Sequence, residues 1–133
     1  RLKPGPEHPD YAAFLYWFHF ANGNLQPTLL RLVTVGRATA GSDHPVLAAT
    51  PDRFARLMAL METRLAEVPW LAGDDFSAAD IMNVFSLTTM RLFMPVDLAP
   101  YPGIRAYLQR IGERPAYRRA MAKGDPDLVP LLS

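Results

Sequence analysis

The sequence contains no cysteine in its 133 residues. This absence excludes a disulfide scaffold, a catalytic thiol and any metal site that uses thiolate ligands. The fold must therefore be held together by packing alone, which agrees with the cytoplasmic location that we expect.

An excess of charge of either sign is also missing, since 14 lysines and arginines face 13 aspartates and glutamates. A nucleic-acid surface normally needs clustered basic residues in excess. The arginines of the C-terminal part are interrupted by Glu113 and Asp125, and they fit a solvated helix face. We therefore expect no nucleic-acid partner.

Long apolar runs and ligand clusters are absent as well. The longest apolar stretch, Tyr11 to Ala21, is broken by His19 and is too short to cross a membrane. The three histidines, His8, His19 and His44, lack the spacing of metal ligands, so we expect no metal site. No glycine-rich phosphate loop or nucleophile elbow is present, and we assign no catalytic residue and no cofactor to this chain.

The thirteen prolines fall between helical patterns rather than in a low-complexity segment. Pro51, Pro102 and Pro115 each suit the first position of a helix, where the missing N–H costs nothing. Apolar residues recur at spacings of three and four between these positions, and no sustained alternation indicates a sheet. The sequence therefore predicts an all-α fold of five or six helices.

The expected elements follow from these patterns. A break or kink is expected at Asn22-Gly23-Asn24, and residues 32–35 allow a strand as an alternative to helix. Thr50 is expected to cap the third helix after a loop over residues 40–49. The predicted helices are 10–22, 25–37, 50–67, 77–94, 102–113 and 115–123, the last ended by Gly124.

The segment from Phe76 to Ile81 predicts the start of a helix that is stabilised in two ways. The Ser77 hydroxyl can accept from the amide of Asp80, and the Asp80 carboxylate can accept from the amide of Ser77, which makes a capping box. Phe76 and Ile81 are spaced as a hydrophobic staple. Because no second carboxylate or base lies in register with Asp80, we assign this residue to capping and not to acid–base catalysis.

The helix that follows carries no formal charge until Arg91. Its apolar residues lie on all sides of the helical wheel, which is typical of a helix surrounded by other helices. We therefore expect this capped helix at the centre of the bundle.

The order of motifs resembles the C-terminal helical domain of cytosolic glutathione transferases of bacterial type. An aromatic first helix is followed by three sequence motifs, which are WLAGDDFSAADI at 70–81, YPGI at 101–104 and IGERPA at 111–116. The resemblance implies an interdomain linker at residues 1–9, the helical domain at 10–123 and a tail at 124–133.

The resemblance also implies a function for the parent protein. A homodimeric transferase would conjugate reduced glutathione, its co-substrate, to hydrophobic electrophiles in detoxification. In the family, the residue that stabilises the thiolate belongs to an N-terminal thioredoxin-like domain, whose pattern does not occur in these residues. We therefore expect this chain alone to be inactive.

The first helix supplies the candidate site residues. Residues three or four apart share a helix face, which groups Tyr16 with Phe20 and Gly23. Core packing is the alternative for Tyr16 and Phe20, and we assign Trp17 and Phe18 to the core. The resemblance implies that the electrophile site is lined by Tyr16, His19, Phe20, Gly23, Gln26 and Pro27, and that Asn24 reaches the glutathione of the partner subunit.

Two other functions stay open. The chain could be a non-catalytic scaffold module of the same fold, which binds other proteins, or an unrelated helical bundle that binds small molecules. Packing that does not enclose the 77–94 helix would favour the unrelated bundle. We also expect the aromatic first helix to expose an apolar patch and to favour self-association.

Overall fold

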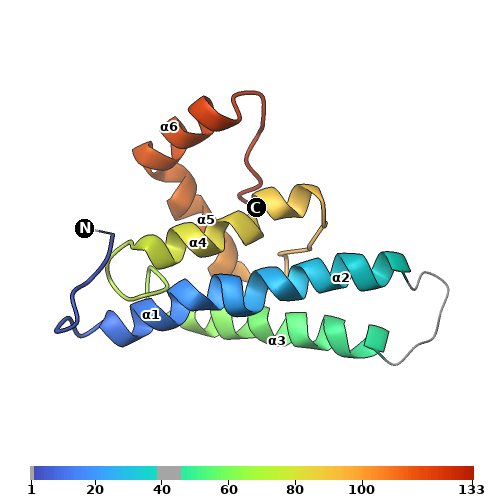
Figure 1. Ribbon diagram of the computed structural model, residues 1–133. Helices are drawn as coiled ribbons and strands as arrows, with labels where there is room; N and C mark the ends of the chain where they lie inside the picture. Colours follow the sequence, from blue (N-terminus) through green and yellow to red (C-terminus); the bar gives the residue numbers. More distant parts are fainter. Residues whose placement is uncertain (1, 39–45) are drawn as a thin grey trace.

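The computed structural model describes residues 2–38 and 46–133, with the main chain only for residues 46–50. Within these ranges every regular element is helical, as the sequence predicts. Six α-helices are accompanied by one π-helical turn, η1, and one 3₁₀ turn, η2 (Figure 1). Their bounds are α1 Tyr11–Phe20, η1 Ala21–Leu25, α2 Gln26–Ala38, α3 Val46–Glu67, α4 Ala78–Leu87, η2 Thr89–Leu92, α5 Pro102–Glu113 and α6 Pro115–Gly124.

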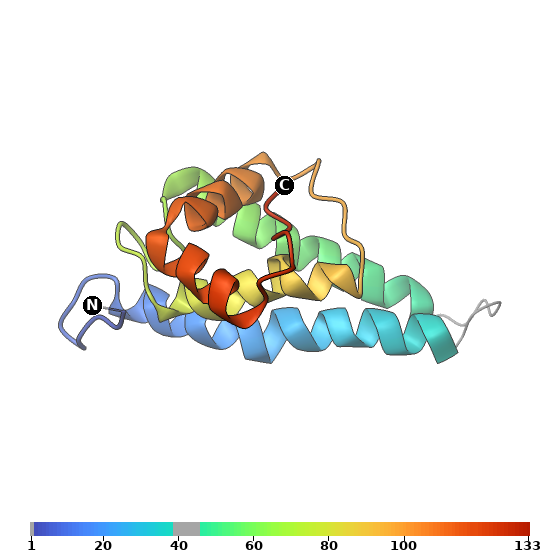
Figure 2. The ribbon, with the colours of Figure 1, turned by 90° about the horizontal axis from the view of Figure 1, so that it is seen from above.

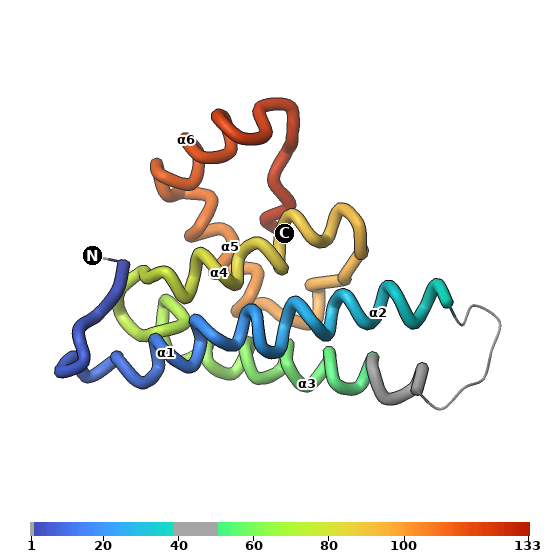
Figure 3. Tube along the Cα trace, in the orientation of Figure 1, coloured from blue at the N-terminus to red at the C-terminus, as the bar shows by residue number. Residues whose placement is uncertain are grey.

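Helices α1 and α2 form one long rod that runs beside α3 (Figures 1 and 2). The interruption expected at residues 22–24 is a widened turn and not a break. The amide of Gln26 donates to the carbonyl of Ala21, five residues earlier, and the chain continues through the turn without leaving the rod (Figure 3). Residues 32–35 are helical and not a strand.

Helix α4 lies between the rod and α6, and it packs on α1 and η1 (Figure 1). Its position agrees with the central place that the sequence predicts, but the burial of its side chains does not. Apart from Leu87, the buried residues are small or polar, whereas the large apolar side chains of Ile81 and Phe85 are 45% and 48% exposed. The buried set is Ala79, Asp80, Asn83, Ser86 and Leu87.

The close packing of α4 on α1 explains this reversal. Small side chains let two helix backbones approach, and large ones are then displaced to the outer face. The buried Asn83 occupies the contact and its side-chain amide donates to the carbonyl of Trp17 at 2.8 Å and to that of Ala79 at 2.8 Å. The NH₂ group is thus satisfied, whereas the buried side-chain oxygen of Asn83 has no hydrogen-bond partner among the described residues.

Two predicted helix ends are wrong. Helix α3 begins at Val46, so Thr50 is not its cap and Pro51 lies inside the helix. The rest of the predicted loop, residues 40–45, lies outside the described residues. Helix α4 ends at Leu87, well before Met94, because Thr88 leaves the helical conformation with φ −123° and ψ −85°.

The first turn of α5 is capped by a residue from another helix. The Glu62 carboxylate on α3 accepts from the amides of Gly103 at 2.7 Å and Ile104 at 2.9 Å. Pro102 takes the first helical position, as expected, and has no N–H to satisfy. This cap joins α3 to α5 beside a continuous hydrophobic core, whose largest fully buried side chains include Tyr107, Phe20, Leu25, Leu29, Met58 and Met61.

Candidate functional site

The loop that precedes α4 is organised around the buried carboxylate of Asp80. One carboxylate oxygen accepts from the amide of Leu71 at 2.9 Å and the other from the amide of Ser77 at 2.8 Å. The hydroxyl of Tyr107, on α5, lies 3.2 Å from the first oxygen. The capping box is present, although the hydrogen bond that the Ser77 hydroxyl accepts at 3.2 Å comes from Ala79 rather than from Asp80.

Burial perturbs both titratable groups of this network. It raises the pKa of Asp80, while the hydrogen bonds from Leu71 and Ser77 act in the opposite direction. Burial, followed by the charge of Asp80, raises the pKa of Tyr107 well above its usual value of 10.0, so its hydroxyl keeps the proton that it donates. Because neither side chain is exposed, no reactant reaches the pair, and its role is structural.

Two arginine side chains, those of Arg64 and Arg114, also contact this loop. Arg64 donates to the carbonyls of Leu71 and Ala72, both at 3.0 Å. The guanidinium of Arg114 lies 3.6 Å from the ring centre of Phe76 and stacks on it. Phe76 and Ile81, the predicted staple, both line an apolar groove of about 250 Å³ between α4, α5 and α6.

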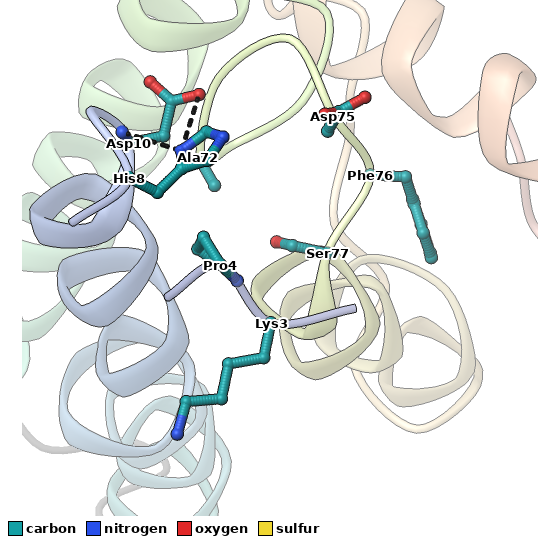
Figure 4. Close-up of a pocket in the computed structure, with 8 residues that line it drawn as sticks. All are labelled: Lys3, Pro4, His8, Asp10, Ala72, Asp75, Phe76 and Ser77. Carbon is teal, nitrogen blue, oxygen red and sulfur yellow. Dashed lines mark hydrogen bonds and ion pairs between the residues drawn. The ribbon is translucent and has the colours of Figure 1, made fainter. Parts of the chain in front are cut away.

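A cavity of about 220 Å³ separates the N-terminal segment from this loop (Figure 4). The amide of Asp10 donates to Nδ1 of His8 at 3.1 Å, while the Lys3 side chain extends away from both. Nearby, the carbonyl of Leu2 accepts from the amide of Ala78 at 2.7 Å and so satisfies a free amide of the first turn of α4. The cavity holds no nucleophile–base pair, and we assign it to the docking of the N-terminal segment.

The predicted substrate residues lie mostly on the exposed side of the rod. Tyr16 is 53% exposed, and His19, Gly23 and Pro27 are also exposed, with Gln26 half-buried. A Cβ atom at Gly23 would meet nothing within 4 Å, so packing does not require glycine there. The face is therefore open to a ligand.

Phe20 departs from the predicted set. Its side chain is 2% exposed and belongs to the hydrophobic core together with Phe14 and Trp17. Tyr16 and Phe20 remain neighbours, with ring centres 6.1 Å apart, but only Tyr16 reaches the surface. The core-packing alternative therefore describes Phe20, while Phe18 is half-buried against the same cluster, as assigned.

The side chain of Asn24 is hydrogen-bonded to a residue of α3. Its side-chain oxygen accepts from Nη2 of Arg53 at 3.2 Å, and Nε of the same arginine donates to the hydroxyl of Thr28 at 3.2 Å. Arg53, Thr28 and Arg31 line a cleft of about 310 Å³ together with Gly23 and Pro27. Sequence reasoning missed both arginines, because they lie on different helices and belong to no motif.

The described residues contain no other obvious centre. No three acidic or histidine side chains among them are grouped as metal ligands would be. None of the described helices is both long enough and apolar enough to pass through a bilayer.

A family model described as glutathione S-transferase, C-terminal domain, matches residues 27–115, which is more than half of the chain. The chain belongs to the glutathione S-transferase C-terminal domain family. The capped loop and α4 both lie inside the matched range, and the aromatic first helix precedes it.

One relative of this glutathione S-transferase domain is the disulfide-bond oxidoreductase YfcG of Escherichia coli strain K12. The two are 31% identical over 120 residues, which cover 88% of this chain and 54% of that protein. Glutathione S-transferase 3 of Zea mays is 27% identical over 106 residues, which cover 78% of this chain and 48% of that protein. The chain therefore spans about half the length of these relatives.

Solved structures show the same domain. A glutathione S-transferase from Actinobacillus pleuropneumoniae superposes with a TM-score of 0.77 and 26% identity, and the match covers 93% of this chain and 55% of that one. A sphingomonad glutathione S-transferase, solved in complex with glutathione, has a TM-score of 0.70 and 25% identity, over 92% of this chain and 58% of that one.

Proposed function

We propose that this chain is the helical domain of a cytoplasmic glutathione S-transferase that conjugates reduced glutathione to hydrophobic electrophiles in detoxification. The observation that carries the proposal is that Tyr16, His19, Gly23 and Pro27, spaced three or four residues apart along the rod, are all exposed. An aromatic ring and, two turns further, a glycine that packing does not require fit an apolar wall with room for a ligand.

We propose that this domain and the rest of the parent protein have different roles in the conjugation reaction. Conjugation needs a glutathione thiolate, which attacks the electrophile, and a neighbouring donor that lowers the pKa of the thiol. The residues described above offer no exposed donor paired with a base. We assign the thiolate-stabilising group to the part of the relatives' length that this chain does not cover, and we assign binding and orientation of the electrophile to this domain.

Dimer contacts complete the proposal. We infer that the parent protein is a homodimer in which Asn24 reaches the glutathione bound to the partner subunit. Its position on the rod, between the exposed Gly23 and the half-buried Gln26, supports this role. Arg53 holds the side chain in one orientation, which reduces the entropy lost when a ligand binds.

Steady-state kinetics of the complete gene product test the electrophile site. With glutathione and 1-chloro-2,4-dinitrobenzene, Tyr16→Ala is expected to raise KM for the aryl halide about fivefold and to leave KM for glutathione unchanged. Phe93→Ala, which removes an aromatic ring that is 75% exposed at the end of η2, is the matched control. Equal kinetics for the two variants would remove Tyr16 from the site.

Two alternatives are separated by further assays. The name of the Escherichia coli relative, a disulfide-bond oxidoreductase, favours disulfide reduction as a second activity, and turnover of bis(2-hydroxyethyl) disulfide without conjugation would select it. A scaffold module of the same fold would form a folded dimer that is not retained on immobilised glutathione. Retention together with conjugation would support the transferase.

A further inference from the structure

We propose that a water molecule is bound inside the helical bundle, on the face of α4 that packs against the rod. Its partners are the side-chain oxygen of Asn83 and the hydroxyl of Ser86. Both side chains are buried, and both atoms are without a hydrogen-bond partner among the described residues. The site does not depend on the proposed transferase function, because it lies in the core and contacts no reactant.

The side-chain amide of Asn83 has a defined orientation. Its nitrogen donates to the carbonyl of Trp17 and to that of Ala79, both at 2.8 Å. A flipped amide would place the oxygen, which only accepts, against those two carbonyl oxygens. The oxygen therefore points away from both carbonyls, and it needs a donor from another source, because a buried polar atom without a partner destabilises the fold.

The hydroxyl of Ser86 lies on the same face of α4, three residues beyond Asn83. Side chains at this spacing are neighbours on a helix, with Cβ atoms about 5–6 Å apart. The two polar atoms form no hydrogen bond with each other. A water molecule at about 2.8 Å from each of them spans such a separation, and it can donate to the Asn83 oxygen while it accepts from the Ser86 hydroxyl.

The chemistry of the two partners favours water over an ion. An amide oxygen and a hydroxyl are both neutral, so a buried ion between them would lose its hydration without gaining an opposite charge. A buried water is normally held by about two to four polar partners, and folded proteins hold about one such molecule for every 27 residues. Asn83 and Ser86 supply two partners from one helix.

The water site lies where α4 meets the widened turn of the rod. Helix α4 packs on both α1 and η1, and Asn83 holds the carbonyl of Trp17, four residues before η1 begins. An insertion beside the main-chain hydrogen bonds is one reason why a helix departs from regular α geometry. Loss of the water is therefore expected to weaken the bond from the amide of Gln26 to the carbonyl of Ala21, which closes the turn.

A high-resolution crystal structure of the complete gene product tests the site directly. We expect an electron-density peak within about 3.2 Å of both the side-chain oxygen of Asn83 and the hydroxyl oxygen of Ser86. The proposal is overturned if this peak is missing. It is equally overturned if the Ser86 hydroxyl donates directly to Asn83 or to a main-chain carbonyl of α4.

The variant Ser86→Ala separates a hydroxyl that holds a water from an isolated one. With the water present, the substitution removes one of its partners, and the equilibrium constant for unfolding in urea is expected to rise about fivefold. An isolated buried hydroxyl only costs desolvation, so an unchanged or lower constant would contradict the site. Thr34→Ala is the control, since this exposed hydroxyl bonds only to its own helix, and it is expected to change the constant less than about twofold.

Hydrogen–deuterium exchange of the same variant tests the connection to the wide turn. In Ser86→Ala the amides of Leu25 and Gln26 are expected to exchange at least about tenfold faster than in the wild type. The amides of Leu108 and Ile111 on α5 report the general loss of stability, and they are expected to change about fivefold or less. An equal acceleration at both places would show that the water does not support the turn.

Discussion

Asp80 is the residue on which the loop before α4 depends. Its two oxygens receive hydrogen bonds from two main-chain amides and two hydroxyls, and the side chain is completely buried. In a buried site a lost hydrogen bond is not replaced by water, so the donor that remains carries the full desolvation cost. The sequence predicts the bond from Ser77, but the partners Leu71 and Tyr107 depend on the tertiary fold.

Replacement of Asp80 by asparagine tests this network. The substitution keeps the shape but places an NH₂ group against a donor, so we expect the free energy of unfolding to fall by about 2 kcal/mol. Urea unfolding followed by circular dichroism measures the change. The control is Asp75→Asn, an exposed carboxylate in the same loop, which is expected to change stability by less than about 0.5 kcal/mol.

The raised pKa of Asp80 predicts a dependence on pH. A carboxyl whose pKa is higher in the folded state than its usual 3.8 binds its proton more tightly when folded. Its contribution to stability is therefore full below about pH 4 and falls as the pH rises through the folded pKa. The difference in unfolding free energy between the wild type and Asp80→Asn should shrink from about pH 4 to pH 7; a gap that widens with pH contradicts this sign.

Tyr16 and Phe20 are neighbours with opposite roles. Removing the buried ring of Phe20 leaves a cavity, and Phe20→Ala is expected to lower the unfolding free energy by about 3 kcal/mol or more. Tyr16→Ala removes an exposed ring and is expected to cost less than about 1 kcal/mol. Thermal unfolding of both variants measures the contrast, and similar losses would show that Tyr16 also belongs to the core.

At the scale of the element, α4 shows which feature of a helix cannot be predicted from a helical wheel. The absence of charge before Arg91 correctly predicts a central helix, because charged residues are costly to bury. It does not predict which face is buried. Packing on α1 selects the small side chains of Ala79 and Ser86, so the large residues face outward.

The start of α3 shows a second limit of predicting helix boundaries from the sequence. Thr50-Pro51 reads locally as a helix start, yet the helix begins at Val46. The missing N–H of Pro51 removes one hydrogen bond. The helix is supported by the burial of Met58, Met61 and Leu65 further along, an interaction that a local sequence signal does not include.

The cap of α5 by Glu62 gives a prediction at this scale. Glu62→Gln keeps one acceptor oxygen, places an NH₂ group against the second amide and removes the charge opposite the helix N-terminus, so we expect a loss of at least about 1 kcal/mol in the free energy of unfolding. Glu67→Gln is the control, because Glu67 is exposed on the same helix. Chemical denaturation of the two variants decides the point, and equal stabilities would mean that the cap contributes nothing beyond a neutral hydrogen bond.

At the scale of the whole molecule, the exposed apolar side chains predict association. Ile81 and Phe85 lie one turn apart on the outer face of α4, in addition to Tyr16 on the rod. We expect the chain to associate at micromolar concentration. Ile81→Ser/Phe85→Ser should lower the sedimentation coefficient towards that of a monomer, whereas Leu60→Ser, on α3, should not; a wild type that is already monomeric would contradict the prediction.

Some residues of the candidate site can be predicted from the sequence motifs, whereas others come together only in the folded chain. The family resemblance places Tyr16, His19, Gly23 and Pro27 at the substrate face, and the structure leaves these residues exposed. Their role in binding remains a prediction. The arginine cleft depends on how α2 and α3 lie against each other, which no local pattern in the sequence specifies.

The π turn at Ala21–Leu25 has a consequence for the spacing of residues along the rod. Such a turn holds one residue more than an α-helix needs, and each residue of an α-helix rotates the chain by about 100°. If the same residues were wound as an ordinary α-helix, Pro27 and Arg31 would be rotated by about 100° relative to Tyr16. Loss of one residue here would instead replace the wide turn by an α-helical turn and leave the surface that carries Tyr16 and Pro27 in register, whereas loss of a residue elsewhere in the rod would divide that surface.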